Sequence, residues 1–445
     1  MTTPSFMKLI IYKLFPWIGS WVASILLILT PTMDLSLAQA LHIAMDQSPE
    51  IQQSLLDIAK SQADRKIARA AFLPSADANL FQQRTRVNED TWTGTSTKGG
   101  PMVLGPYTWG QIGFSTNIPL FDRSLWNRWK AAEHTENSDM AKARITRESL
   151  AALVVGQYLL VQRADESVKA AQSRVELAQS LTTLAMDQQK NNVGTKLDTL
   201  RSQVQLQNER QRLIQAQSRL QITMFGLIKL LNIEPTTRLH LTDDLPVSDS
   251  PQWSFRDAYE SGLKQRPELA SLNAREKAAR RLEKSARSER LPSLVLTGAY
   301  GSAGLLNEPY IPTAQIYVGL RMPILSGGRI SADIAKAKAE LKHIREEHRD
   351  FEAKVGLEIQ VAQSEMETSR SEVEVSSEAV SLAEEELVQA RHRFEAGVSN
   401  NIDVVNAQDE LAKATDSRIE ALYHLKQAHA DFARAMGRLE PLFAR

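Results

Sequence analysis

The order of apolar and polar residues along the chain predicts six helices, because apolar positions recur with helical spacing over long stretches. The predicted helices cover 36–72, 124–191, 198–232, 254–290, 328–396 and 401–437. Two of them have about 68 residues each, or about 100 Å at 1.5 Å per residue. No globular domain needs a helix of that length. In each half, the two shorter helices placed end to end have about the same length as the long helix. We therefore expect long antiparallel helical hairpins.

Both long helices carry a seven-residue repeat of apolar residues, with small residues three places after most of them. In the first helix the repeat consists of Val154, Val161, Val168 and Val175, followed by Ala164, Ala171 and Ala178. In the second helix it consists of Val373, Val380, Leu387 and Phe394, followed by Ser376, Ala383 and Ala390. Such heptads predict supercoiled helix packing with closely approaching backbones.

Four segments have the alternating pattern of strands, at 73–86, 106–119, 291–301 and 312–325. The last is the clearest, because every second residue from Ile316 to Ile324 is apolar, while the residues between them, from Gln315 to Pro323, are mostly polar or small. One face of this strand is therefore apolar. Aromatic residues gather in and around these segments, as in outer-membrane barrels: Trp92, Trp109, Trp126, Trp129, Tyr107, Tyr300, Tyr310 and Tyr317. An ordinary sheet of two hairpins is the alternative.

Segments of the first half of the chain recur in the same order in the second half. "SLAQALHIAMDQSPEI" at 36–51 matches "SFRDAYESGLKQRPEL" at 254–269, and "QIGFSTNIPLFDRS" at 111–124 matches "QIYVGLRMPILSGG" at 315–328. The first half has extra polar residues before its second strand, which predicts an exposed loop there. The pattern predicts an internal structural duplication.

The long helices are interrupted twice in the same way. "DQQKNNVGTKLDTLRSQ" at 187–203 matches "RFEAGVSNNIDVVNAQ" at 393–408, so that Asn192 stands where Gly397 stands later. Asn and Gly both tolerate the left-handed conformation that ends a helix. Each interruption therefore predicts a turn between the two arms of a hairpin.

These patterns give the expected domain organisation. Residues 1–32 have basic residues followed by an apolar stretch, which predicts an export signal peptide, with a retained membrane anchor as the alternative. Residues 33–445 then form one domain made of two repeats, 34–235 and 254–441, joined by the linker 236–253.

Composition narrows the classes of function. Lys and Arg total 53 and so do Asp and Glu, so the net charge is zero and nothing favours nucleic acid as a partner. Cysteine is absent, which excludes thiol catalysis, disulfides and cysteine zinc sites. The histidine pairs His343 with His348 and His424 with His429 are five residues apart, a poor metal-ligand spacing on a helix. We expect no catalytic residue, no metal and no cofactor, and hence no enzyme.

The predicted strands are long enough to cross an outer membrane, but four strands cannot close a barrel, since the smallest barrels have about eight. Open strand edges are not tolerated in lipid. If these strands cross a membrane, several chains must share one barrel, and the attached helices must form a shared tube.

With these features the chain resembles the TolC family of outer-membrane efflux proteins. The likeness covers the mature chain, from "LSLAQALHIAMDQSPEI" through "NIPLFDRS" and "MPILSGGR" to "FEAGVSNNIDVVNAQDEL" and "AMGRLEP". It implies a mainly α fold with β, in which a homotrimer places a twelve-stranded β-barrel in outer-membrane lipid and an α-helical barrel in the periplasm. It also implies a passive exit duct, which an inner-membrane transporter feeds through a periplasmic adaptor (membrane fusion) protein.

The resemblance assigns roles to the two interruptions. The adaptor would dock on the hairpin tips, formed by Asn192, Val193, Gly194, Gly397, Val398 and Ser399. Asp403 would form an acidic ring at the periplasmic aperture, while the second ring position is Asn406, which is neutral. Asp198 would take part in contacts that close the aperture. An Asp in the first turn of a helix is also favoured by capping and by the helix dipole whatever its function.

The sequence departs from the family at the expected gate contacts. Phe394 stands where an aromatic hydroxyl is expected and Ser399 where a basic residue is expected. Arg391 or Arg393, about one turn upstream, is the candidate substitute.

A different class of protein also fits part of the pattern. A periplasmic coiled-coil adaptor or structural scaffold, anchored by residues 14–29, would explain the heptads and the export segment. It does not explain the duplicated strands or the matched helix lengths.

Overall fold

The computed structural model describes residues 32–88, 103–243 and 253–439. The export segment at 1–31, most of the extra loop of the first half and half of the linker, 244–252, lie outside the described residues. β1, Thr32–Leu35, begins at the last residue of the range expected for the signal peptide.

The helices lie close to the predicted ranges. They are α2 (Leu37–Gln47), α3 (Pro49–Ala70), α5 (Arg123–Lys190), α6 (Lys196–Leu231), α7 (Phe255–Gln265), α8 (Pro267–Ser288), α9 (Arg329–Glu395) and α10 (Asn401–Ala435). The two long helices are confirmed, with 68 and 67 residues. Across the described ranges, no helix combines the length and the apolar character needed to cross a membrane.

The first helix of each half is divided, which corrects the continuous helices expected at 36–72 and 254–290. The breaks fall at Ser48 and Arg266, whose backbones are extended with ψ values of 126° and 122°. Both residues precede a proline, Pro49 and Pro267, and the proline ring disfavours the helical conformation of the residue before it.

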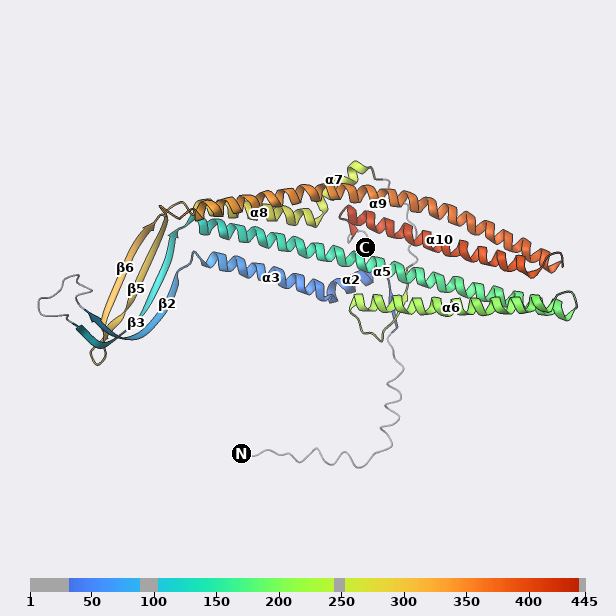
Figure 1. Ribbon diagram of the computed structural model, residues 1–445, viewed down its shortest axis with the longest axis horizontal. Coiled ribbons are helices and arrows are strands. Elements are labelled where there is room, and N and C mark those ends of the chain that lie inside the picture. Colours follow the sequence, from blue (N-terminus) through green and yellow to red (C-terminus); the bar gives the residue numbers. More distant parts are fainter. Residues whose placement is uncertain (1–31, 89–102, 244–252, 440–445) are drawn as a thin grey trace, which may run out of the picture. The chain divides into compact units, whose positions relative to one another are not determined.

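Four strands form one antiparallel sheet in the order β2-β3-β5-β6 (Figure 1). They are β2 (Ser75–Asn88), β3 (Val103–Phe121), β5 (Ser293–Leu305) and β6 (Ile311–Arg321). The first three are shifted or extended by a few residues from their predicted ranges, whereas β6 is shorter and ends four residues before the predicted end at 325. Within the described chain, β2 and β6 each keep one unpaired edge. The two hairpins meet where β3 pairs with β5, for example Gly113 with Gly301.

The sheet has one apolar face and one polar face, as the alternation in β6 predicts. The registers place Leu80, Ile112, Ile316 and Val318 on the same face, where they are 78%, 53%, 79% and 59% exposed. On the opposite face Asn79 donates a hydrogen bond to Ser115 Oγ at 3.1 Å. A face of large apolar side chains left uncovered on a sheet calls for an apolar environment.

The chain divides into two compact units, each built from both halves. The first comprises 1–52, 146–266 and 354–445. Its main core surrounds Tyr158, which is fully buried and donates a hydrogen bond to Leu35 O at 3.1 Å. In the same core β1 pairs in parallel with β4 (Arg238–Leu241), two strands that periodicity did not reveal. Most of the predicted heptad positions of α5 and α9 are buried in this unit, for example Val161 and Val380, while Val168, Val175 and Val373 are half-buried.

The second unit comprises 53–145 and 267–353 and contains the sheet. Its helices α5 and α8 pack through small residues spaced by seven. Ser138 Oγ lies 3.0 Å from Ser271 Oγ, and Ser124 Oγ lies 2.9 Å from Ser285 Oγ. Buried hydroxyls that pair across the contact satisfy one another while the backbones approach closely.

Candidate functional site

The two hairpin tips have the same turn geometry. Asn192 and Gly397 occupy corresponding positions with φ of 58° and 70°, so the expected left-handed turns are confirmed. In the first tip Val193 N donates to Gln188 O at 3.0 Å, and in the second Val398 N donates to Arg393 O at 2.9 Å. These bonds satisfy carbonyl groups at the end of each long helix.

The surfaces of both tips are apolar at their apex. Val193 and Val398 are 72% and 71% exposed. Gly194 is half-buried against Gln188, and Ser399 is half-buried as well. Each tip thus presents one exposed valine at its apex.

Asp198 caps the helix that follows the first tip. Its carboxylate accepts a hydrogen bond from Thr195 Oγ1 at 2.5 Å and from Thr195 N at 3.3 Å, while its own N–H donates to Thr195 Oγ1 at 3.2 Å. This reciprocal pair is a capping box. The capping explanation of Asp198 therefore has direct geometric support.

Asp403 is placed differently. It lies exposed in the first turn of α10, where the capping task belongs to Asn400, whose side chain accepts a hydrogen bond from Ile402 N at 3.2 Å. Within the described ranges, the Asp403 carboxylate has no hydrogen bond or ion pair. Asn406 is exposed one turn further along the same side. Asp403 thus offers a free negative charge beside the second tip.

Phe394 belongs to an apolar cluster and is only 4% exposed. It packs with Leu181 and Ala185 of the first hairpin and with Val404 of α10. An aromatic hydroxyl would be out of place here, and the phenyl ring instead contributes packing between the hairpins.

The candidate substitutes for the missing gate contacts do not meet Asp198 or Asp403. Arg391 Nε donates to Glu395 Oε1 at 2.8 Å, a pair within its own helix. Arg393 is exposed and has no ion-pair partner among the described side chains. The proposed arginine contacts are therefore absent from this conformation.

The contacts that do join the two tips were missed by sequence reasoning. Asn401 is 1% exposed, and its Nδ2 donates to Asp198 O at 2.9 Å and to Ser202 Oγ at 2.7 Å. Gln188 Nε2 donates to Phe394 O at 3.1 Å. The only signal in the sequence for these contacts is the adjacent pair of asparagines, Asn400 and Asn401. Asn400 caps α10, which leaves the side chain of Asn401 free to turn inward.

Further from the tips, charged side chains join α10 to the first hairpin. Arg174 Nη1 lies 3.0 Å from Asp416 Oδ1, and Arg212 Nη1 lies 2.7 Å from Glu209 Oε1 and 3.6 Å from Asp409 Oδ1. Glu209 is only 4% exposed, so its charge depends on these partners. The hairpins are thus held together by polar contacts along their length.

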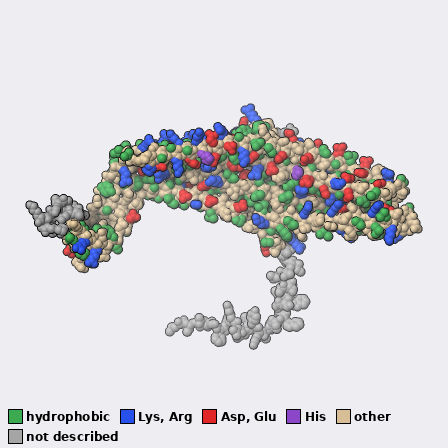
Figure 2. Space-filling model, viewed as in Figure 1, with side chains coloured by type: hydrophobic (Ala, Val, Ile, Leu, Met, Phe, Trp, Pro, Cys, Tyr) green, Lys and Arg blue, Asp and Glu red, His purple; other side chains and the backbone are tan. Residues whose placement is uncertain are grey.

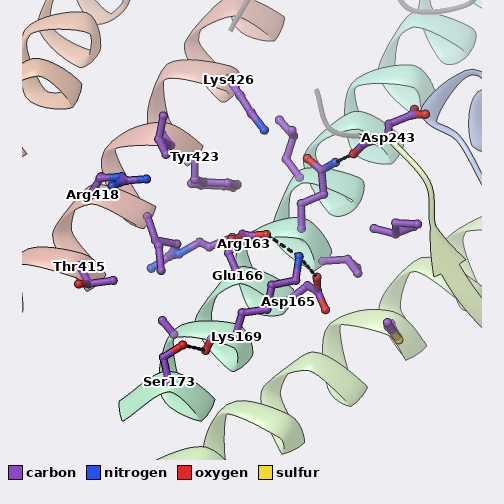
Figure 3. A pocket seen from close by; sticks show the side chains of 18 of the residues that line it. Arg163, Asp165, Glu166, Lys169, Ser173, Asp243, Thr415, Arg418, Tyr423 and Lys426 are labelled. Carbon is purple, nitrogen blue, oxygen red and sulfur yellow. Dashed lines mark hydrogen bonds and ion pairs between the residues drawn. The ribbon is translucent and has the colours of Figure 1, made fainter. Parts of the chain in front are cut away.

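A cavity of about 870 Å³ lies between α5, α10 and β4 in the first unit (Figure 3). Two of its basic side chains pair with carboxylates. Lys169 Nζ lies 3.0 Å from Asp165 Oδ2 and 2.7 Å from Glu166 Oε1, and these carboxylates raise the pKa of Lys169. Arg163 lies 3.0 Å from a Glu420 oxygen. Both basic residues that α5 contributes to the lining are thus paired with carboxylates of the chain.

Comparison with known families gives one match that spans most of the chain. The family model described as "Outer membrane efflux protein" matches residues 40–232 and 258–438. The alkaline protease secretion protein AprF of Pseudomonas aeruginosa is 23% identical over 431 residues, covering 94% of this chain and 87% of the relative. The pyoverdine export outer membrane protein OpmQ of Pseudomonas putida is 23% identical over 429 residues, covering 90% and 85%.

Solved structures share the fold. The outer membrane protein VceC of Vibrio cholerae superposes with a TM-score of 0.76 at 15% identity, covering 90% of this chain and 96% of VceC. The outer membrane channel CmeC of Campylobacter jejuni superposes with a TM-score of 0.77 at 17% identity, covering 91% and 86%.

Proposed function

The chain belongs to the outer membrane efflux protein family, and from this premise we propose that it is the channel component of a tripartite efflux pump or a type I secretion system. It lies in the outer membrane and acts there as an exit duct. In our proposal the duct is passive, and an inner-membrane transporter delivers substrates to it through a periplasmic adaptor protein.

The observation that carries the proposal is the four-stranded sheet. Its apolar face is exposed, and its edge strands β2 and β6 are each unpaired on one side. In lipid these edges must pair, and a sheet of four strands cannot close on itself. Three copies contribute four strands each, which gives a barrel of twelve strands with its apolar face toward lipid.

The tips would then lie at the periplasmic end of a shared helical tube. Asp403, exposed and unpaired, would form a ring of three carboxylates at the aperture, with Asn406 as a neutral second ring. The exposed valines of the tips, Val193 and Val398, would contact the adaptor. The order helix, helix, strand, strand, helix, helix occurs twice in the chain and supports an internal duplication.

The proposal is tested by locating the protein and measuring conductance. Expressed with its export segment in a Gram-negative host, the protein should fractionate with the outer membrane. After detergent extraction it should have the mass of a trimer by light scattering. In a planar bilayer it should conduct ions in discrete steps.

Two results would contradict the proposed channel. A protein that fractionates with the inner membrane, and that remains silent in the bilayer, would be an adaptor or scaffold rather than a channel. A monomer in the outer membrane would exclude the shared barrel.

A further inference from the structure

The polar face of the sheet carries a band of apolar side chains at the end away from the helices. Trp109 pairs directly with Leu305, and Phe81 and Ile311 lie in the next row of the same face. This is the face of Asn79, because successive side chains of a strand point to opposite sides and Phe81 is two residues further on. Each of the four strands thus contributes one member. We call these four residues the aromatic band: Phe81, Trp109, Leu305 and Ile311.

The aromatic band is open to its surroundings. Phe81, Leu305 and Ile311 are 39%, 40% and 67% exposed, and Trp109 is half-buried. The rings of Phe81 and Trp109 meet edge to face, with 4.9 Å between their centroids and 84° between their planes. Aromatic rings in this arrangement keep surface on which a further ring can pack.

At the level of the band, the two faces of the sheet exchange their character. On the opposite face, Gln82, Arg84 and Thr108 follow Leu80 and Ile112 toward this end of the sheet. An arginine is tolerated near the edge of a bilayer but is costly in its hydrocarbon. The aromatic band is therefore not a continuation of the apolar face, and contact with hydrocarbon does not account for it.

The rows of the sheet around the band are uncharged. Strands β3 and β5 contain no charged residue, and the amides of Gln83 and Gln111 stand in the same two rows as the band. On the side shown in Figure 2, charged side chains are dense over the helices and sparse over most of the sheet. The next row toward the helices is also uncharged: Asn79, Gly113, Gly301 and Thr313.

The middle of that next row has no side chains. Gly113 pairs with Gly301, and a Cβ added to Gly113 would lie 2.8 Å from Tyr300 O, closer than Cβ atoms come to other atoms. The backbone is therefore bare at Gly113, a diagonal neighbour of Phe81 at about 7–8 Å. A flat molecule that packs on Phe81 can lie against this backbone.

We propose that the aromatic band is a binding site for neutral, planar aromatic solutes inside the duct. The inference rests on the proposed channel function, in which the apolar face meets lipid and the opposite face lines the interior, and it names a class of substrate. Aromatic side chains pack on planar rings, while the amides of Gln83 and Gln111 donate and accept hydrogen bonds at the edge of the solute. Apolar surface with a few polar groups is the usual lining of a small-molecule site.

Protection of a cysteine tests the site directly, because the natural chain has no cysteine. Gln83→Cys stands across from Trp109, and its reaction with a charged, membrane-impermeant thiol reagent is followed in protein reconstituted into liposomes. Caffeine, a neutral planar aromatic solute, should slow this reaction in a saturable manner. The matched control is Asp77→Cys, on the same face but about 20 Å closer to the helices, whose reaction should keep its rate.

Two double variants identify the side chains responsible. Combined with Gln83→Cys, Phe81→Ala with Trp109→Ala should raise the caffeine concentration for half-protection by roughly tenfold, because stacking on the two rings is lost. The control, Phe114→Ala with Tyr300→Ala, removes a directly paired and exposed aromatic pair from the opposite face and should leave that concentration unchanged. Phe81→Tyr keeps the ring and should keep the protection.

The class of solute is tested in the same assay. Maltose, which is neutral but has no aromatic ring, should leave the reaction of Gln83→Cys unchanged at the concentration at which caffeine gives half-protection. Protection by maltose as strong as that by caffeine would overturn the assignment to aromatic solutes.

The outcomes separate this site from the channel function, because the conductance of every variant is measured alongside. A conducting channel in which caffeine does not protect Gln83→Cys, or protects Asp77→Cys equally, would overturn the binding site and leave the channel intact. Unchanged protection after both rings are removed would also overturn it. If the natural chain does not conduct, the proposed function fails and this inference fails with it.

Discussion

Asp403 is a charged residue beside the second tip whose setting leaves it available to ions. The carboxylate is exposed and unpaired within the described chain, and Asn400 performs the capping task beside it. Three copies around a narrow axis would attract cations. We therefore predict that Asp403→Asn lowers the preference for cations, and weakens block by divalent ions, in planar bilayer recordings.

Two matched changes serve as controls for Asp403. Asn406→Asp, one turn further on, should add a second acidic ring and raise cation preference. Asp198→Asn should leave selectivity unchanged, because its carboxylate serves the cap, but should cost about 0.3–1 kcal/mol of stability at the first tip, since it removes a negative charge from the first turn of α6. Unaltered selectivity in Asp403→Asn would remove this residue from the aperture.

Asn401 is predicted to hold the two tips together. Asn401→Leu removes both hydrogen bonds and leaves Asp198 O and the Ser202 hydroxyl without this donor, at a cost of about 1–3 kcal/mol. We expect larger single-channel conductance and faster amide exchange in the first turn of α6. Ser202→Ala, which keeps the bond to Asp198 O, should have a smaller effect. Equal conductance in Asn401→Leu would show that the tips do not limit the duct.

Tyr158 makes the stability of the first unit sensitive to alkaline pH. Burial, with the nearby charge of Asp243 as a second cause, raises the pKa of Tyr158 to about 12, above the ordinary value of 10.0. The neutral form is favoured in the folded chain, so this contribution is present below pH 10 and is lost as the pH rises through about 12. Tyr158→Phe should be about 1 kcal/mol less stable at pH 8, because it loses the bond to Leu35 O.

The sign of the Tyr158 effect is checked by denaturant titration at two pH values. Between pH 8 and pH 11 the natural chain should lose more stability than Tyr158→Phe does. Parallel losses would mean that other groups carry the alkaline transition.

The turns of the two tips have the same left-handed backbone conformation but place different residues, Asn192 and Gly397, at the corresponding position. Gly397 has φ of 70° with no atom near the position of a Cβ, so the cost of a side chain there is backbone strain alone. Gly397→Ala should cost about 1–2 kcal/mol, whereas Gly397→Asn should cost less, since Asn192 adopts the same conformation in the first tip. Thermal denaturation followed by circular dichroism measures both, and equal losses would contradict the argument.

The helices and strands were largely predictable because each is long and its periodicity is sustained. The long helices α5 and α9 agree with their predicted ranges within a residue or two at each end. The short strands β1 and β4 were not predictable, because four residues carry no periodicity and each strand is defined only by its distant partner. The breaks at Ser48 and Arg266 could have been predicted from Pro49 and Pro267, because a proline disfavours the helical conformation of the residue before it.

The candidate site was predictable in its turns but not in its contacts. Asn192 and Gly397 follow from local conformational preference. The inward orientation of Asn401 depends on Ser202, about 200 residues away in the chain, which no local pattern records. Likewise Arg391 is attractive as a substitute partner for Asp198 from the resemblance to the family, yet its guanidinium pairs with Glu395 in its own helix.

At the scale of the whole molecule, the sheet should tolerate charge on one face only. Ile316→Arg places a guanidinium on the apolar face, where a charge near the middle of a bilayer costs about 2–4 kcal/mol. Gln315→Arg, the adjacent residue on the polar face, is the matched control. We expect Ile316→Arg to reduce the amount of folded protein recovered from outer membranes, with little change for Gln315→Arg. Equal recovery would mean that this face does not meet lipid.

The pairing of β1 with β4 has a consequence for how the protein is made. Thr32 pairs with Arg238, so the first described strand has its partner more than 200 residues later. An outer-membrane protein crosses the inner membrane as an unfolded thread, N-terminal end first. This strand pair therefore cannot form until more than half of the chain has emerged, and the core around Tyr158, which includes Ala430 and Leu439, cannot close until nearly all of the chain has emerged.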